Sequence, residues 1–280
     1  MRALTFLARR FVAGDTLDDA VRQVRRLNGE GIKATLDNLG EECQTRAQAL
    51  AAVDEYVKML GRIALERLDC NVSLKLTQFG LGLDVDFCRV NLFRVLDEAA
   101  RSGNFVRIDM EGSSYTQKTL DLLRQAKAHY PRVGIVIQAM LRRSEKDVAG
   151  LVRDGICVRL CKGAYKEPAD LAFPEKKDVN ANYDKLVRML LKGPTPAFAT
   201  HDDERIAHAV AAAERAGLGK DQYEIQMLYG LRTKRWGELV RQGHVVRIYT
   251  PYGSHWFPYF YRRIRERKEN LLFVLRNFFE

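Results

Sequence analysis

The sequence lacks any uninterrupted apolar run long enough to form a membrane-spanning helix. It also contains no linker rich in Pro, Gly or Ser and no low-complexity segment, so we expect residues 1–280 to form a single domain. The N-terminal stretch is basic, but Arg9 and Arg10 interrupt its apolar residues, which argues against a signal peptide. These absences predict a soluble globular protein.

Cysteine is scarce as well, with five residues whose number is odd and whose spacing is not that of a disulfide framework. Reduced thiols in a cytoplasmic protein are the simplest interpretation. Cys157 and Cys161 are four residues apart, but no His or Cys cluster accompanies them, as a zinc site would require. We therefore expect structural cysteines and no metal site.

No Gly-x-Gly-x-x-Gly motif follows the first predicted strand, which disfavours the alternative of a doubly wound dinucleotide-binding sheet. Instead, short β-rich runs alternate with helical stretches along the chain. Eight such units over about 250 residues are typical of an α/β protein with a (β/α)8 TIM barrel. The predicted strands are Ala34–Leu39, Val72–Thr77, Val106–Glu111, Gly134–Ala139, Ile156–Lys162, Ala197–His201, Tyr223–Leu228 and Val245–Tyr249.

An N-terminal helix is predicted within residues 1–31, as an extension that precedes the barrel, with Asp15 or Thr16 as its N-cap. The barrel and an active-site helix are assigned to residues 34–270, and a C-terminal apolar helix to residues 271–280. Apolar periodicity predicts the barrel helices. The clearest of them are Ala47–Leu65, Phe87–Arg101, Lys118–His129 and Arg205–Ala216.

Polar and apolar side chains alternate along the predicted strands, so each strand has one polar face. Lys75, Asp109 and Arg159 lie late in their strands on these faces. If the apolar faces pack on the helices, these charges point into the barrel, where they are costly unless they are paired or bind a ligand. We therefore predict a site in which Lys75 pairs with Asp109; the alternative is a buried structural ion-pair network. Comparable late positions are held by Gln138, Thr200, Gln226 and Tyr249.

The stretch Val245–Arg267 combines a β-branched strand, a turn at Pro251-Tyr252-Gly253 and an aromatic-rich helix. On this helix Arg262 and Glu266 stand at i,i+4, and Arg263 lies about 100° round the axis from Arg262. Two guanidiniums beside one carboxylate would suit a zwitterion, with its carboxylate on the arginines. A solvated basic helix end is the alternative.

The net charge of +10 is unevenly distributed, because residues Leu231–Glu280 hold 11 basic and 4 acidic residues and so carry +7. Such a region indicates an anionic partner, which could be a phosphate, a carboxylate, nucleic acid or a membrane surface. A nucleic-acid-binding protein is the alternative from another class, but it leaves the charged strand ends unexplained, and we expect no nucleic acid partner. The aromatic residues that suggested it are Trp256, Phe257, Tyr259 and Phe260.

Seven short motifs, in order along the chain, resemble those of proline dehydrogenase, the flavoenzyme of proline catabolism. The resemblance extends from about residue 34 to residue 270, and the chain is most similar to the monofunctional, bacterial-type form. It implies a distorted (β/α)8 barrel that binds FAD at the carboxyl ends of the strands, with the last helix over the barrel mouth. The motifs are VSLKLTQFG, IDMEGSSYT, IQAML, VRLCKGAYKEP, FATHD, YEIQMLYG and RIYTPYGSHW with YFYRRIRER.

The resemblance also implies roles for individual residues. Those assigned to catalysis are Asp109, Arg159, Lys75 and Tyr249. Those assigned to the substrate are Lys75, Asp109, Tyr249, Arg262, Arg263 and Glu266. Those assigned to FAD are Met110, Gln138, Arg159, Lys162, Gly163, Ala164, Thr200, His201 and Gln226. The chain departs from the family pattern at Cys161, where a small aliphatic residue is usual, and carries Asp202 where Asn also occurs.

The implied reaction is oxidation of L-proline to Δ1-pyrroline-5-carboxylate by hydride transfer to flavin N5. Electrons would pass to a membrane quinone, and the product to a separate pyrroline-5-carboxylate dehydrogenase. Hydroxyproline oxidation is the alternative, although Tyr249 leaves little room for a ring hydroxyl. Because quinones stay in the bilayer, we expect a cytoplasmic protein with peripheral contact at the inner face of the membrane. The candidate contact is the apolar segment Asn270–Phe279 beside the basic cluster Arg262–Lys268, which could instead pack on the barrel.

Overall fold

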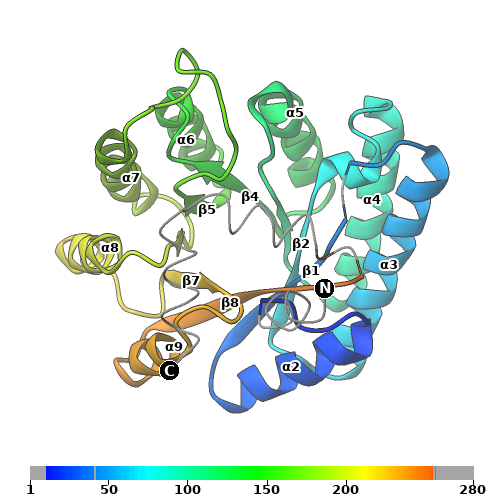
Figure 1. The fold of residues 1–280 in the computed structure, drawn as a ribbon, viewed down its shortest axis with the longest axis horizontal. Coiled ribbons are helices and arrows are strands. Elements are labelled where there is room, and N and C mark those ends of the chain that lie inside the picture. Colours follow the sequence, from blue (N-terminus) through cyan, green and yellow to red (C-terminus); the bar gives the residue numbers. More distant parts are fainter. Residues whose placement is uncertain (1–10, 41, 255, 257–280) are drawn as a thin grey trace, which may run out of the picture.

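The computed structural model describes residues 11–40, 42–254 and 256, and in this part of the chain eight parallel strands form a closed barrel (Figure 1). Each strand pairs with the next along the sequence, and the first pairs with the last. The predicted (β/α)8 barrel is confirmed. The strands are β1 (Lys33–Asn38), β2 (Cys70–Leu74), β3 (Val106–Ile108), β4 (Val133–Gln138), β5 (Cys157–Cys161), β6 (Ala197–Ala199), β7 (Glu224–Leu228) and β8 (Val245–Tyr252).

Helices between consecutive strands form an outer ring around the barrel (Figure 1). Several begin where a short polar side chain can accept a hydrogen bond from the first turn: Thr16 accepts from Asp19 N, and Asp84 from Phe87 N at 3.0 Å. The described helices are α2 (Leu17–Gly29), α3 (Arg46–Leu65), α4 (Val85–Ser102), α5 (Ser113–His129), α6 (Ser144–Arg153), α7 (Lys176–Leu190), α8 (Asp203–Arg215) and α9 (Thr233–Arg241), with a 3-10 helix η1 (Leu76–Phe79).

Helix α2 precedes the barrel and packs against β1 and β8, where the barrel closes. Its buried residues, Ala20, Val21, Val24 and Leu27, recur at helical spacing and so form one apolar face. The predicted N-terminal helix is confirmed, with Thr16 as its cap. The helix covers the seam between the first and last strands, a position that lies outside the repeating strand–helix units.

The two faces of the strands follow the predicted alternation. Val72 and Leu74 of β2 and Val106 and Ile108 of β3 are completely buried in the main hydrophobic core, together with residues of α3 and α4. The intervening side chains of the same strands contact one another across the barrel interior. The fold therefore places the polar face of each strand toward the barrel axis.

Strand β2 ends three residues earlier than predicted, at Leu74 rather than Thr77. The backbone N–H of Thr77 donates to Glu111 Oε2 at 3.1 Å, so it is not available to a neighbouring strand. The chain turns instead into η1, which ends at Gly80 with a left-handed φ of 98°.

Strand β8 continues to Tyr252, so the predicted turn at Pro251-Tyr252-Gly253 was placed too early. Pro251 and Tyr252 pair with Asp37 and Asn38 of β1, which extends the strand beyond Tyr249. Proline, which has no N–H to donate, is tolerated here because the register with β7 ends at Tyr249 and Pro251 pairs with β1 alone. Its carbonyl accepts from Ala13 N at 2.7 Å.

The predicted helix over the barrel mouth and the C-terminal apolar helix lie outside the described residues. Within the described ranges, no helix is both long and apolar enough to cross a bilayer. The same part of the chain contains no group of three or more His, Cys, Asp or Glu side chains that could hold a metal ion.

Candidate active site

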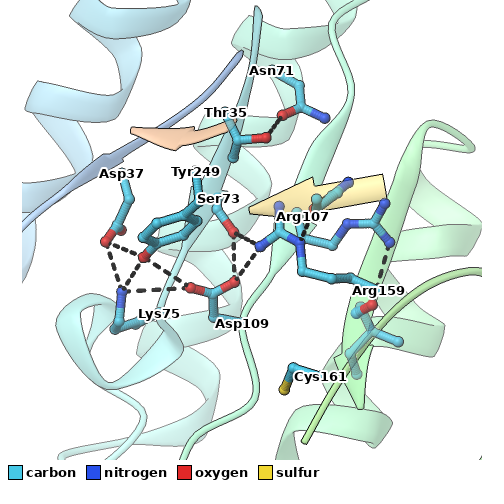
Figure 2. Close-up of polar contacts among 12 residues, drawn as sticks. Thr35, Asp37, Asn71, Ser73, Lys75, Arg107, Asp109, Arg159, Cys161 and Tyr249 are labelled. Carbon is cyan, nitrogen blue, oxygen red and sulfur yellow. Dashed lines mark hydrogen bonds and ion pairs between the residues drawn. The ribbon is translucent and has the colours of Figure 1, made fainter. Parts of the chain in front are cut away.

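Three polar side chains from three different strands meet inside the barrel. Ser73 of β2 donates to Asp109 Oδ1 at 2.5 Å, and Arg159 Nη1 of β5 lies 3.0 Å from Ser73 Oγ and 3.2 Å from Asp109 Oδ1 (Figure 2). Asp109 immediately follows β3. The alternation of side chains predicted that these residues share the barrel interior, and the structure confirms it.

Lys75, which follows β2, lies between two carboxylates. Its Nζ is 2.9 Å from Asp37 Oδ2 and 3.5 Å from Asp109 Oδ2, and the hydroxyl of Tyr249 is 3.3 Å away (Figure 2). Burial alone would lower the pKa of Lys75, but Asp37 and Asp109 raise it well above its ordinary value. The side chain is therefore an ammonium donor. The predicted pair with Asp109 is confirmed, but Asp37 is the nearer partner.

Tyr249 of β8 joins the same cluster and forms part of its wall. Its hydroxyl donates to Asp37 Oδ2 and lies 3.4 Å from Asp109 Oδ2, and the Arg159 guanidinium is 5.6 Å from its ring centroid. The ring packs against an apolar group formed by Val12, Leu39 and Trp256. These contacts fix both ends of the side chain, so the ring has a defined place beside the charged cluster.

Arg159 is almost completely buried, and not all of its hydrogen-bond donors have a partner among the described residues. Its Nε donates to Gln226 Oε1 at 2.6 Å and its Nη1 to the Ser73–Asp109 pair, whereas Nη2 is buried without a hydrogen-bond partner among the described residues. A buried guanidinium donor without an acceptor costs free energy. The unsatisfied nitrogen is therefore a candidate contact for a bound group with an acceptor atom.

A second charged cluster lies deeper in the barrel, and it is structural. Arg247 of β8 binds Glu224 of β7 through two nitrogens, at 2.8 and 2.9 Å, and Gln226 Nε2 donates to the same carboxylate at 2.6 Å. Arg107 of β3 donates to the backbone carbonyls of Ile135 and Cys157. The predicted alternative of a buried ion-pair network thus describes this deeper layer, and Gln226 connects it to Arg159 above.

Several residues assigned to FAD by resemblance lie together at the ends of β3 to β5. Gln138 Nε2 donates to the carbonyl of Glu111 at 3.0 Å, and its Oε1 is 3.4 Å from Ala164 N. Gly163 has a left-handed φ of 119°, and a Cβ there would lie 2.4 Å from Met140 Sδ. Only glycine fits this backbone without strain. Met110 is buried next to Asp109.

The remaining FAD candidates lie beyond β5 and β6. Lys162 Nζ is 2.6 Å from Asp202 Oδ2, an ion pair that the sequence did not indicate. Thr200 Oγ1 accepts from Asp202 N at 3.1 Å, and His201 Nε2 accepts from Leu228 N at 3.1 Å. Arg232 donates to the His201 carbonyl at 2.6 Å and so holds this loop in place. The loop presents polar groups at the same edge of the barrel as Lys162.

Asp37 was not identified from the sequence, although the signal that found Asp109 was present. It lies late in β1 on the polar face, two residues after Thr35, and it is completely buried. Its partners Lys75 and Tyr249 are 38 and 212 residues away in the chain. Arg262, Arg263 and Glu266, the other predicted substrate residues, lie outside the described residues.

Comparison with known proteins decides the family. The model of the family described as Proline dehydrogenase matches residues 20–276. Proline dehydrogenase 1 of Bacillus subtilis is 42% identical over 270 residues, which cover 96% of this chain and 89% of that protein. The chain belongs to the proline dehydrogenase family. Proline dehydrogenase of Deinococcus radiodurans is 37% identical over 276 residues, with the same coverage.

Solved structures of larger relatives agree with this assignment. Proline utilization A (PutA) from Bdellovibrio bacteriovorus superimposes with a TM-score of 0.88 at 26% identity, covering 93% of this chain and 32% of that one. PutA from Corynebacterium freiburgense has a TM-score of 0.83 at 21% identity, covering 98% and 32%, and supports the fold alone. The family's barrel therefore also occurs as one part of longer chains.

Proposed function

We propose that this chain catalyses the FAD-dependent oxidation of L-proline to Δ1-pyrroline-5-carboxylate, with a quinone as final electron acceptor. The observation that carries the proposal is the convergence of Lys75, Asp109, Tyr249 and Arg159 inside the barrel of a proline dehydrogenase family member. These side chains lie in, or directly after, the strands β2, β3, β5 and β8, and they contact one another inside the barrel. A separate pyrroline-5-carboxylate dehydrogenase would consume the product.

The residues present fit a bound flavin. Arg159 Nη2 is a buried donor that lacks an acceptor among the described residues, and an acceptor atom of the bound group would satisfy it. Gly163, whose left-handed backbone only glycine adopts without strain, is also proposed to contact the cofactor. Met110, Gln138 and Ala164 would lie along the ring system, and Lys162, Thr200, His201 and Gln226 would contribute further polar contacts. When bound, FAD supplies the electron-pair acceptor for the hydride that leaves the ring carbon next to nitrogen.

The chain's own residues would bind and orient the substrate. Lys75 is held as an ammonium donor, and the Tyr249 ring is fixed beside it. Among the described residues, Asp109 Oδ2 has only long contacts, at 3.4 Å to Tyr249 and 3.5 Å to Lys75, so it retains acceptor capacity for an N–H group of the substrate. Arg262 and Arg263 are proposed to bind the substrate carboxylate.

A flavin spectrum tests the proposal. The purified chain, supplied with FAD and then freed of excess, should retain the visible absorption bands of an oxidised flavin, and L-proline should bleach them in the absence of oxygen. A matched Lys75→Met variant should keep its flavin but bleach far more slowly. Protein that takes up no flavin, or flavin that proline leaves oxidised in the unsubstituted chain, would contradict the proposed function.

Specificity is tested with the same preparation. Tyr249 is held in place at its hydroxyl by Asp37 and along its ring by apolar contacts, so it has little freedom to accept a substituted pyrrolidine. We therefore expect L-proline to be preferred over hydroxyproline. A comparison of kcat/KM for the two substrates decides between them.

A further inference from the structure

Asp37 contacts both Lys75 and Tyr249 but lies behind them. One carboxylate oxygen, Oδ2, accepts from Lys75 Nζ at 2.9 Å and from the Tyr249 hydroxyl (Figure 2). The side chain is completely buried. Asp109, which faces the same two donors, lies 3.5 and 3.4 Å from them. Asp37 is thus the closest acceptor for two groups proposed to touch the substrate, while its own burial leaves no room for substrate contact.

The other carboxylate oxygen of Asp37 is fixed by the scaffold. Oδ1 lies 2.9 Å from the hydroxyl of Tyr56, a completely buried residue of α3. The same hydroxyl lies 2.7 Å from the Ser73 carbonyl and 3.4 Å from Asn38 N. Tyr56 therefore ties the carboxylate to α3 and to two strands, so the orientation of Asp37 does not depend on a ligand.

The charges around Asp37 make the arrangement sensitive to its ionisation. Burial raises the pKa of Asp37, Lys75 opposes that effect, and the nearby Asp109 adds to it. Asp37 is also the principal group that raises the pKa of Lys75 against the effect of burial. Loss of the Asp37 charge would therefore weaken both the position and the protonation of Lys75. In the part of the chain that the structure describes, Tyr249 and Tyr56 are the other titratable groups that hydrogen-bond to this carboxylate.

We propose that Asp37 is a positioning residue: one buried carboxylate oxygen holds Lys75 Nζ and the Tyr249 hydroxyl together, and acts on the substrate only through them. The inference rests on the proposed function and adds a residue from β1 to it. It explains why a second carboxylate, that of Asp37, contacts Lys75 and Tyr249 although Asp109 already faces the same two donors.

The test is Asp37→Asn. The amide oxygen can replace Oδ2, and the amide nitrogen can donate to Tyr56, whose hydrogen then goes to the Ser73 carbonyl, so the variant should fold. Flavin content should be unchanged, while kcat/KM for L-proline falls by about tenfold or more. The alkaline limb of its pH profile should move to lower pH, because Lys75 loses its nearest negative charge.

A double-mutant cycle separates positioning from a structural role. In a Lys75→Met background, Asp37→Asn should lower kcat/KM far less than it does in the unsubstituted chain, since only its contact with Tyr249 remains. Tyr130→Phe, the control, removes a tyrosine hydrogen bond outside the cluster, to the Asn104 carbonyl at 2.6 Å, and should change kcat/KM by less than about threefold. Additive effects of Asp37→Asn and Lys75→Met, or an unmoved pH profile, would overturn the inference.

Two further outcomes remain decisive. If Asp37→Asn does not fold, Asp37→Ser, which removes the charge with a smaller polar side chain, takes its place in the cycle. If the unsubstituted chain does not oxidise proline, the proposed function fails by itself. The midpoint of thermal unfolding is then measured for Asp37→Asn, Lys75→Met and the double variant. Non-additive changes in this midpoint support the contact between Asp37 and Lys75, and additive changes overturn it.

Discussion

Replacement of Glu224 by Gln perturbs the deeper charged layer of the barrel, which contacts the candidate site through Gln226. Glu224 accepts two hydrogen bonds from Arg247, at 2.8 and 2.9 Å, and a third from Gln226 at 2.6 Å. A glutamine has one acceptor oxygen where glutamate has two. At least one of the three N–H donors would therefore face the amide nitrogen, which is itself a donor. The Arg247 charge also loses its neutralising partner while it stays buried.

The magnitude follows from the ionisation of Glu224. Burial alone would raise its pKa, but Arg247 lowers it from 4.5 to about 2. A difference of about 2.5 between the unfolded and folded pKa corresponds to about 3 kcal/mol of stability at neutral pH. The loss of one partner from a buried ion pair costs about 3–5 kcal/mol in general. We therefore expect a loss of about 3 kcal/mol, or roughly 5 °C in the unfolding midpoint of a chain this long.

The assay is thermal or urea unfolding at pH 7, with a surface pair as the matched control. Lys185 of α7 and Glu145 of α6 lie 2.6 Å apart, and their side chains are 49% and 51% exposed. Glu145→Gln should therefore cost less than about 0.5 kcal/mol, because exposed ion pairs are screened by water. The interior pair and the surface pair differ chiefly in burial, so the comparison isolates that factor.

The pH dependence gives a second criterion. Because the pKa of Glu224 is lower in the folded state, its contribution is fully present above the unfolded value of 4.5 and is lost as the pH falls toward about 2. The difference in stability between the unsubstituted chain and Glu224→Gln should therefore shrink between pH 5 and roughly pH 3. A cost no larger than that of Glu145→Gln, or a difference that does not change with pH, would refute the reasoning.

Three further predictions concern the candidate site. Arg262→Met and Arg263→Met should each raise KM for proline with little loss of flavin, because each removes a charge-assisted bond of about 1.5–3 kcal/mol; an unchanged KM in both would remove them from the carboxylate site. Tyr249→Ser should narrow the preference for proline over hydroxyproline, which the ratio of kcat/KM values measures. Gly163→Ala should lower the flavin-to-protein ratio, since a Cβ there meets Met140 and strains a left-handed backbone; full flavin occupancy would contradict this.

Much of the barrel could be predicted from the sequence because its units are local. Most strands are short runs of apolar and β-branched residues, and the helices have their own apolar periodicity, in some cases with a side-chain N-cap, so neighbours in the chain reveal them. The ends of β2 and β8 were predicted less well. Their limits depend on Glu111 and on the pairing with β1, which are contacts between distant segments.

The candidate site shows the same division. Alternation along single strands identified Lys75, Asp109 and Arg159 as interior charges, and the order of the strands suggested the pairing of the first two. The resemblance to a known family supplied Lys162, Gly163 and Ala164 beyond the end of β5, whereas helical spacing had already indicated Arg262, Arg263 and Glu266. Asp37 was missed because its position alone does not show which donors it meets.

The sequence by itself determined the type and order of the elements and which face of each strand is polar, because both depend on residues within a few positions of one another. Only the tertiary structure decided which interior charges meet. Closure of the barrel brings β1 against β8, and so places Asp37 between Lys75 and Tyr249. The pairing of β7 with β8 brings Glu224 against Arg247, while Arg159 keeps one nitrogen without a hydrogen-bond partner among the described residues. Such pairings follow from distances across a closed sheet, which no single stretch of the chain encodes.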